Sequence, residues 1–177
     1  MQLRSGEKKA IAIIAIVTAL FVVVVGATVA ALTAGRQHDD RGYLQMAIGK
    51  QLHRVEPVRW CDLFLRVCDP PLSQIQRTTP HTPVPIGESV VMSVSKNIAE
   101  GPWTLALVYS TPHGIVEDET TQESGSSFTT VINSRADRVL VGITVTPASV
   151  IQNGPTSVYP RGVLTVQTAP TGFRLNL

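Results

Sequence analysis

The feature that most constrains this chain is an uncharged, apolar segment near its N-terminus. Between Lys9 and Gly35 there is no Asp, Glu, Lys or Arg, and the segment contains the runs IAIIAIV and FVVVV. At 1.5 Å per residue, positions 10–34 form about 37 Å of helix, which exceeds the hydrocarbon core of a bilayer, about 30 Å. The sequence therefore predicts a transmembrane helix over residues 10–34, preceded by a basic leader at 1–9.

A cleaved secretory signal is the alternative interpretation of this segment, because it also places basic residues before an apolar stretch. The apolar region of a signal peptide is about 7 to 15 residues long and ends at a small-x-small site. The greater length here favours a retained anchor, although a weak cleavage site around Ala30, Ala31 or Ala34 leaves removal open. The first cysteine is Cys61, so no lipoprotein anchor follows the segment.

The predicted orientation of the transmembrane helix rests on the large globular portion that follows it rather than on flanking charge. Three basic residues precede the segment and three follow it closely (Arg4, Lys8, Lys9; Arg36, Arg41, Lys50), which leaves the positive-inside rule nearly tied. A short basic leader followed by a large globular portion is typical of a signal anchor. We expect a single-pass protein of the cell membrane with its C-terminal domain outside the cytoplasm.

The two cysteines agree with an oxidising location. Cys61 and Cys68 lie early in the exported portion, where a short-loop disulfide forms and persists. Metal ligation and a redox pair are the alternatives, but metal sites usually need further Cys or His at fixed spacing, and a thioredoxin-like pair would be CxxC. A structural disulfide is the favoured interpretation.

The charge balance gives no indication of nucleic-acid binding. Removing Arg4, Lys8 and Lys9 from the 15 basic residues, and Glu7 from the 13 acidic ones, leaves 12 of each in the exported portion. The basic surplus therefore belongs to the leader, where it suits the cytoplasmic lipid surface. We expect the membrane and other integral membrane proteins as partners, and no nucleic acid.

Beyond a polar linker at 35–42, the pattern is that of short β-strands. Alternation of apolar and polar residues is clearest in segment 89–96, where Val90, Met92 and Val94 share one face. We expect this segment and 103–110 to form the middle of the core. Residues 43–48 and 51–55 read as a hairpin with a two-residue type II′ turn, with a helix as the competing interpretation. The predicted strands are about eight in number and lie at 43–48, 51–55, 58–65, 89–96, 103–110, 128–132, 139–145 and 163–168.

Many short strands separated by Pro, Gly, Asn and Ser predict a mainly β domain over 43–168, an immunoglobulin-like antiparallel sandwich, followed by a tail at 169–177. Residues 72–85 and 111–127 read as irregular connections, the second an exposed hairpin loop. Its acidic group Glu117–Glu119 would hold Ca²⁺ only if the loop folded back. A solvated loop tip is the preferred interpretation.

The residues of the β region also resemble a known family, the small, mostly uncharacterised actinobacterial envelope proteins with one N-terminal membrane segment and an extracytoplasmic β domain. The likeness covers about residues 43–168, and Tyr159-Pro160-Arg161 departs from it. It rests on Trp60-Cys61-Asp62 with Cys68, Val91–Val94, Ile98-Ala99, Gly101-Pro102-Trp103, Leu105–Tyr109, Thr129–Val131 and Val141–Val145. Some proteins of this kind look like accessory subunits of membrane assemblies, including the cytochrome bcc-aa3 respiratory supercomplex.

No pattern in the sequence predicts catalysis, a cofactor or a metal site. There is no phosphate-binding glycine loop, nucleophile elbow, HExxH or CxxC, and the four histidines are far apart. We expect a non-catalytic accessory subunit of a membrane complex, with an envelope lipid- or glycan-binding module as the alternative. The candidate helix-packing residues are Gly26, Ala27 and Ala30, and the candidate partner contacts are Trp60, Phe64, Phe173, Leu175 and Leu177, although Trp60 and Phe64 would equally suit packing on the disulfide.

Overall fold

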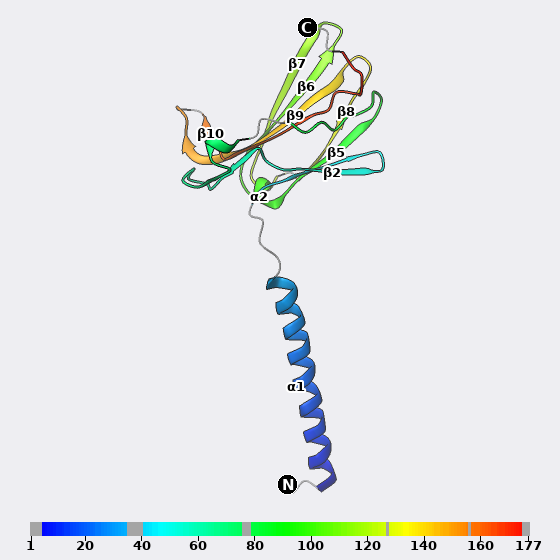
Figure 1. Ribbon diagram of the computed structural model, residues 1–177, viewed down its shortest axis with the longest axis vertical. Coiled ribbons are helices and arrows are strands. Elements are labelled where there is room, and N and C mark those ends of the chain that lie inside the picture. The colour runs from blue at the N-terminus through cyan, green and yellow to red at the C-terminus, as the bar shows by residue number, and fades with distance from the viewer. Residues whose placement is uncertain (1–4, 35–40, 76–78, 127, 156, 175–177) are drawn as a thin grey trace. The chain divides into compact units, whose positions relative to one another are not determined.

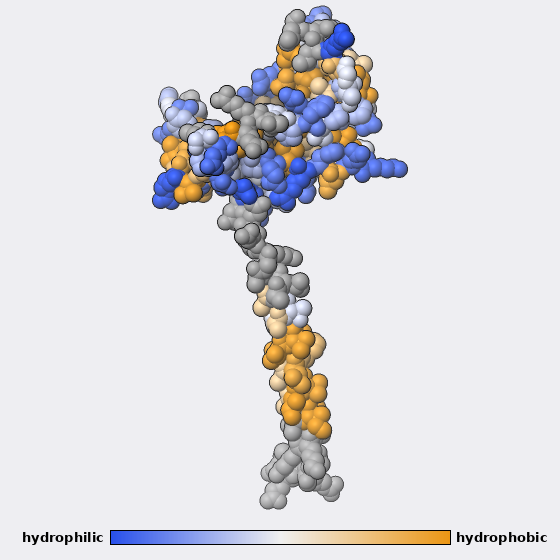
Figure 2. Space-filling view, in the orientation of Figure 1, coloured by the Kyte–Doolittle hydropathy of each residue, from blue (hydrophilic) through white to orange (hydrophobic). Residues whose placement is uncertain are grey.

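The computed structural model describes residues 5–34, 41–75, 79–126, 128–155 and 157–174, which fall into two units (Figure 1). The first unit is the helix α1 (Ser5–Ala34). Its stretch Ile13–Ala30 has a mean hydropathy of 2.8, and every side chain of that stretch is exposed. Figure 2 shows these side chains as an apolar band on the helix. By length and composition the helix is able to cross a membrane, as an anchor or as a signal sequence.

The helix has no unpaired hydroxyl at its two described threonines. The Thr18 and Thr28 hydroxyls donate to the carbonyl oxygens of Ile14 and Val24, at 2.9 and 2.6 Å. A polar group left without a partner in hydrocarbon is destabilising by several kcal/mol, at about the cost of a lost hydrogen bond in an apolar medium. Both hydroxyls are thus compatible with lipid around the helix.

The second unit is an antiparallel β-sandwich, and the predicted fold class is confirmed. Its smaller sheet has the order β2-β1-β5-β8, and its larger sheet the order β4-β3-β11-β9-β6-β7, with β10 paired to β9. The strands are β1 (Leu44–Ile48), β2 (Gln51–Val55), β3 (Arg59–Cys61), β4 (Cys68–Asp69), β5 (Ser89–Val94), β6 (Trp103–Thr111), β7 (Gly114–Gln122), β8 (Thr129–Asn133), β9 (Val139–Gln152), β10 (Val158–Pro160) and β11 (Gly162–Gln167). Two short helical segments are η1 (Leu72–Gln74) and α2 (Lys96–Ala99).

One hydrophobic core joins the inward faces of the two sheets. Leu44 and Met46 of β1 and Val90 and Met92 of β5 are fully or almost fully buried, as expected for strands covered on one side. The larger sheet supplies Trp103, Leu105, Leu140, Ile143, Val145, Leu164 and Val166 to the same cluster. The predicted central role of β5 and β6 is therefore correct, and β9 shares it.

The first hairpin is as predicted, and the helical alternative for residues 44–55 is excluded. β1 and β2 pair in register from Leu44 with Val55 to Ile48 with Gln51, which leaves Gly49 and Lys50 as the turn. Gly49 has φ +56°, a conformation that glycine adopts without the steric penalty of a side chain. The residues whose spacing also suits a helix are Leu44, Ile48, Leu52 and Val55; the first two are alternate buried positions of β1 and Val55 ends β2 buried, whereas Leu52 is exposed.

Several predicted boundaries were wrong, and the strand expected over 139–145 continues to Gln152. The strand expected over 58–65 ends at Cys61, and residues 62–67 form the tip of a hairpin instead. The loop expected over 111–127 contains a nine-residue strand, β7, paired to β6 along its whole length. β7 lies at the edge of its sheet and most of its residues are exposed, so it has no apolar alternation by which a sequence could reveal it.

Candidate functional site

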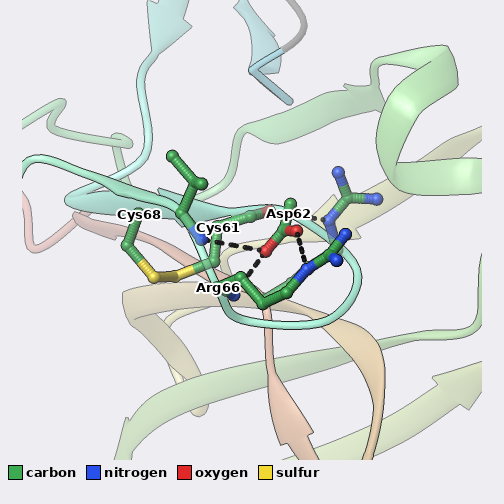
Figure 3. The surroundings of a disulfide bond; sticks show 6 residues. Cys61, Asp62, Arg66 and Cys68 are labelled. Atoms are coloured by element: carbon green, nitrogen blue, oxygen red, sulfur yellow. Dashed lines mark hydrogen bonds and ion pairs between the residues drawn. A yellow bond between two sulfur atoms is a disulfide. The ribbon is translucent and has the colours of Figure 1, made fainter.

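The predicted disulfide is present and closes a small hairpin of the larger sheet (Figure 3). Cys61 ends β3 and Cys68 begins β4, and the two residues are direct cross-strand partners. The backbone N–H of Asp62 donates to the carbonyl of Val67 at 2.9 Å, which extends the hairpin one step beyond the disulfide. The chain between the cysteines is therefore held at its base by a covalent bond and a ladder hydrogen bond.

Asp62 organises the tip of this hairpin. Its carboxylate accepts hydrogen bonds from the backbone N–H groups of Arg66 and Val67, at 2.6 and 3.2 Å, and from Nε of Arg66 at 3.3 Å. Desolvation acts to raise the pKa of the Asp62 carboxyl, but these hydrogen bonds and the charge of Arg66 outweigh it and leave the pKa below its usual value. Leu65 completes the turn at φ +57°, a conformation uncommon for a bulky residue and frequent at functional sites.

The tip presents apolar side chains to solvent. Leu63, Phe64 and Val67 are 45%, 54% and 73% exposed. The Arg66 guanidinium lies 4.9 Å from the centre of the Phe64 ring, so a cation accompanies the exposed aromatic. Because the disulfide and Asp62 hold the loop in shape, these side chains are displayed by an ordered backbone.

A second apolar segment lies beside the tip. The backbone N–H of Val150, near the end of β9, donates to the carbonyl of Leu63 at 3.1 Å. Figure 2 shows apolar surface in the region where Figure 1 places β10. β10 pairs with this end of β9. We call the exposed apolar side chains of the tip, the end of β9 and β10 the hairpin patch: Leu63, Phe64, Val67, Val150, Ile151, Val158 and Tyr159.

Trp60 supports the hairpin from below instead of joining its surface. The side chain is 6% exposed and belongs to the core, so of the two candidate aromatics near the disulfide only Phe64 is displayed. The Arg161 guanidinium stacks 4.4 Å from the Trp60 ring, and its Nε donates to the carbonyl of Cys61 at 3.4 Å. Burial lowers the pKa of Arg161 from its usual value, while Asp62 and Glu100 act to raise it, and an arginine remains charged under these conditions.

An open hollow of about 600 Å³ lies next to the hairpin. Apolar groups of Leu63, Phe64 and Val67 and charged groups of Arg66 and Arg161 are among those that line it. Its mouth is wide, and its lining mixes apolar side chains with both signs of charge. Such a surface suits contact with another molecule's exterior better than enclosure of a small ligand.

The remaining candidate residues are placed as follows. Gly26, Ala27 and Ala30 lie on α1, and no heavy atom lies within 4 Å of the Cβ position of Gly26, so that flank of the helix is open. Phe173 is half-buried, with its N–H donating to the carbonyl of Pro170 at 3.0 Å. Leu175 and Leu177 lie outside the described residues.

The acidic cluster does not form the convergent site that Ca²⁺ requires. Glu117, Asp118 and Glu119 are successive residues of β7, so their side chains alternate between the two faces of the sheet. Asp118 pairs with Arg138. Within the described part of the chain, no group of three or more His, Cys, Asp and Glu is placed to hold a metal ion.

Part of the site was not visible in the sequence. Arg161 reaches the hairpin by a hydrogen bond to the carbonyl of Cys61, 100 positions earlier, and the end of β9 reaches it through the bond from Val150 to Leu63. The departure of Tyr159-Pro160-Arg161 from the family pattern is the one signal of this in the sequence. Two of the histidines lie elsewhere: Nε2 of His81 is 2.9 Å from the carbonyl oxygen of Ala169, and His113 lies in the turn before β7. Neither is part of the hairpin.

Comparison with known proteins places the chain in a family. A family model described as "Protein of unknown function (DUF2771)" matches residues 37–168, which agrees with the extent of the resemblance seen in the sequence. No curated protein and no solved structure matches the chain. Since the matched region spans most of the chain and every strand found among the described residues, the protein belongs to the DUF2771 family.

Proposed function

We propose that this protein is a non-catalytic accessory subunit of a membrane protein complex, anchored by α1 with its β-sandwich outside the cytoplasm. The observation that carries the proposal is the coexistence of two attachment surfaces: the apolar helix Ile13–Ala30 and the exposed hairpin patch. Exposed apolar surface of this kind on a soluble domain is usually covered by a membrane or by another protein.

The disulfide supports the location. Cys61 and Cys68 account for both cysteines of the chain, and bonds of this kind persist in oxidising compartments. In intact cells we expect both sulfurs to resist a thiol-alkylating reagent until a reductant is added. Free, alkylated cysteines in a membrane-bound protein would contradict the extracytoplasmic placement.

Small residues on the helix support a protein partner within the bilayer. Gly26 and Ala30 are four positions apart and share one helix face, where small side chains let another helix approach closely. The resemblance to actinobacterial envelope proteins makes the cytochrome bcc-aa3 respiratory supercomplex the first assembly to test. Other integral membrane proteins remain candidates on the same chemistry.

The proposal is tested by affinity purification of the full chain in mild detergent, with the co-purifying membrane proteins identified by mass spectrometry. Gly26→Leu should reduce the recovery of a helix-packed partner, because the larger side chain fills the close-approach face. Val24→Leu is the matched control, since position 24 is about 160° away around the helix. Recovery of the protein alone, without stoichiometric partners, would refute the proposal.

A second candidate function, binding of an envelope lipid or glycan, is favoured by one observation. A groove of about 540 Å³ runs along the open side of the sandwich, between β6 and β7 of one sheet and β8 of the other. Leu107 and Tyr109 contribute to it, with Thr130 opposite. Mass spectrometry of lipid and glycan extracted from the purified protein tests this function, and Leu107→Asp should remove a ligand held there.

A further inference from the structure

We propose that the hairpin patch is a membrane-contact surface whose exposed side chains lie among the headgroups and upper acyl chains of the bilayer that α1 crosses. This inference rests on the proposed anchoring and adds a second, shallow membrane contact made by the β-sandwich itself. It assigns the lipid bilayer, rather than a partner protein, as the occupant of the patch.

The first argument is where the chain joins the sandwich. Arg41 pairs with Asp69 of β4 at 3.0 Å, one residue beyond Cys68. The next residue, Gly42, lies directly against the Trp60 ring, and Trp60 precedes Cys61. The first described residues of the sandwich are thus in contact with the base of the disulfide hairpin.

The second argument is covalent reach. The six residues 35–40 connect Ala34 of α1 to Arg41. Even when fully extended, that connection spans no more than about 25 Å, and a flexible chain of this length averages about 15 Å. This bound holds for any relative orientation of the two units. The connection therefore limits how far the base of the hairpin can lie from the end of α1, so the bilayer surface is within its reach in the anchored protein.

The third argument is the chemistry of the tip. Leu63, Phe64 and Val67 are the kind of side chains that enter the boundary between headgroups and acyl chains. The Arg66 guanidinium lies 4.9 Å from the centre of the Phe64 ring and pairs with Asp62, so the cation beside the exposed aromatic is already balanced by a carboxylate. A neighbouring aromatic with a polar end, Tyr159, is also exposed and has the amphipathic character typical of membrane interfaces.

The fourth argument is charge. The three carboxylates around the hairpin are each paired with a cation: Asp62 with Arg66, Asp69 with Arg41, and Glu100 with Lys96, at 3.3, 3.0 and 3.3 Å. No surplus of negative charge therefore opposes approach to lipid. The contact should depend on apolar burial and change little with ionic strength.

The experiment uses the full chain in phosphatidylcholine vesicles whose acyl chains carry bromine near the headgroup, which quenches tryptophan fluorescence at short range. Phe64→Trp places a reporter in the patch. Ile115→Trp is the control, because Ile115 is 44% exposed and pairs with Ser110 of β6. Ser110 is seven residues along β6 from Trp103, the first residue of that strand, which is about 24 Å of extended chain. Wild-type protein gives the background from Trp60 and Trp103.

In brominated vesicles, Phe64→Trp should lose fluorescence beyond the wild-type background and emit at shorter wavelength than in detergent, and iodide should quench it less. Ile115→Trp should behave as it does in detergent. Equal quenching of the two variants would overturn the inference, as would protection of Phe64→Trp that appears only after other membrane proteins are added. Loss of the protein from the vesicles in an alkaline wash would refute the anchoring instead, so the two failures are distinguishable.

Discussion

Replacing Gly42 by alanine should destabilise the sandwich through a steric clash at the base of the hairpin. A Cβ at this position would lie 2.4 Å from Cη2 and 2.7 Å from Cζ3 of Trp60, and 2.6 Å from Cγ1 of Ile98. Ordinary contacts between carbon atoms are about 3.5 to 4.0 Å. Ile98 is fully buried and Trp60 is 6% exposed, so neither side chain has solvent to move into.

The magnitude follows from how tightly the Trp60 ring is held. Gly162 lies against the same ring, where a Cβ would be 2.6 Å from Cε3, so the indole is confined by close backbone approach at two places. Overpacking a rigid core site is destabilising by about 1 to 3 kcal/mol, and we expect the upper end of that range here. For a domain of this size, a loss of about 3 kcal/mol lowers the melting temperature by roughly 10 °C.

The assay is thermal unfolding of the full chain in detergent, followed by circular dichroism in the β-sheet region. Gly101→Ala is the matched control, because no heavy atom lies within 4 Å of that Cβ position, and its effect should stay within about 0.5 kcal/mol. Trp60→Phe, which vacates the outer indole ring, should partly rescue Gly42→Ala in a double-mutant cycle. Equal melting temperatures for Gly42→Ala and Gly101→Ala would refute the steric reasoning.

Three further predictions concern the hairpin and the core. Replacing both Cys61 and Cys68 by alanine should lower the free energy of unfolding by about 2.5 kcal/mol, the chain-entropy value for a loop of this length, and the loss should match that caused by reductant in the wild type. Asp62→Asn should destabilise the protein at pH 7. Because the pKa of Asp62 is lowered in the folded state, the variant's loss of unfolding free energy relative to wild type should shrink as the pH falls below 3.8, the ordinary pKa, toward the folded pKa. Urea unfolding at a series of pH values measures this loss, and a loss independent of pH would contradict the carboxylate's role. Leu164→Ala removes a fully buried side chain and should lower the free energy of unfolding by about 2 to 5 kcal/mol in the same assay.

Much of the architecture was predictable because local sequence carries it. An uncharged run longer than a bilayer is thick predicts the helix wherever it occurs, and the alternation of Val90, Met92 and Val94 predicts a strand covered on one side. The short spacing of Cys61 and Cys68, in a portion expected to lie outside the cytoplasm, predicts the disulfide. Each of these inferences needs only neighbouring residues and the solvent on either side.

The arrangement of the site was decided by tertiary structure. The sequence predicts a loop where β7 lies, because an edge strand exposed along most of its length needs no apolar periodicity and its acidic residues give no strand signal. The sequence names both Phe64 and Trp60 as candidate contacts and does not distinguish them. Trp60 is buried because Gly42, Gly162 and Arg161 pack against its ring, and these residues are distant in sequence. The hairpin patch exists because pairing in the larger sheet brings the end of β9 beside residues about 90 positions earlier, and no local pattern encodes which distant strands become neighbours.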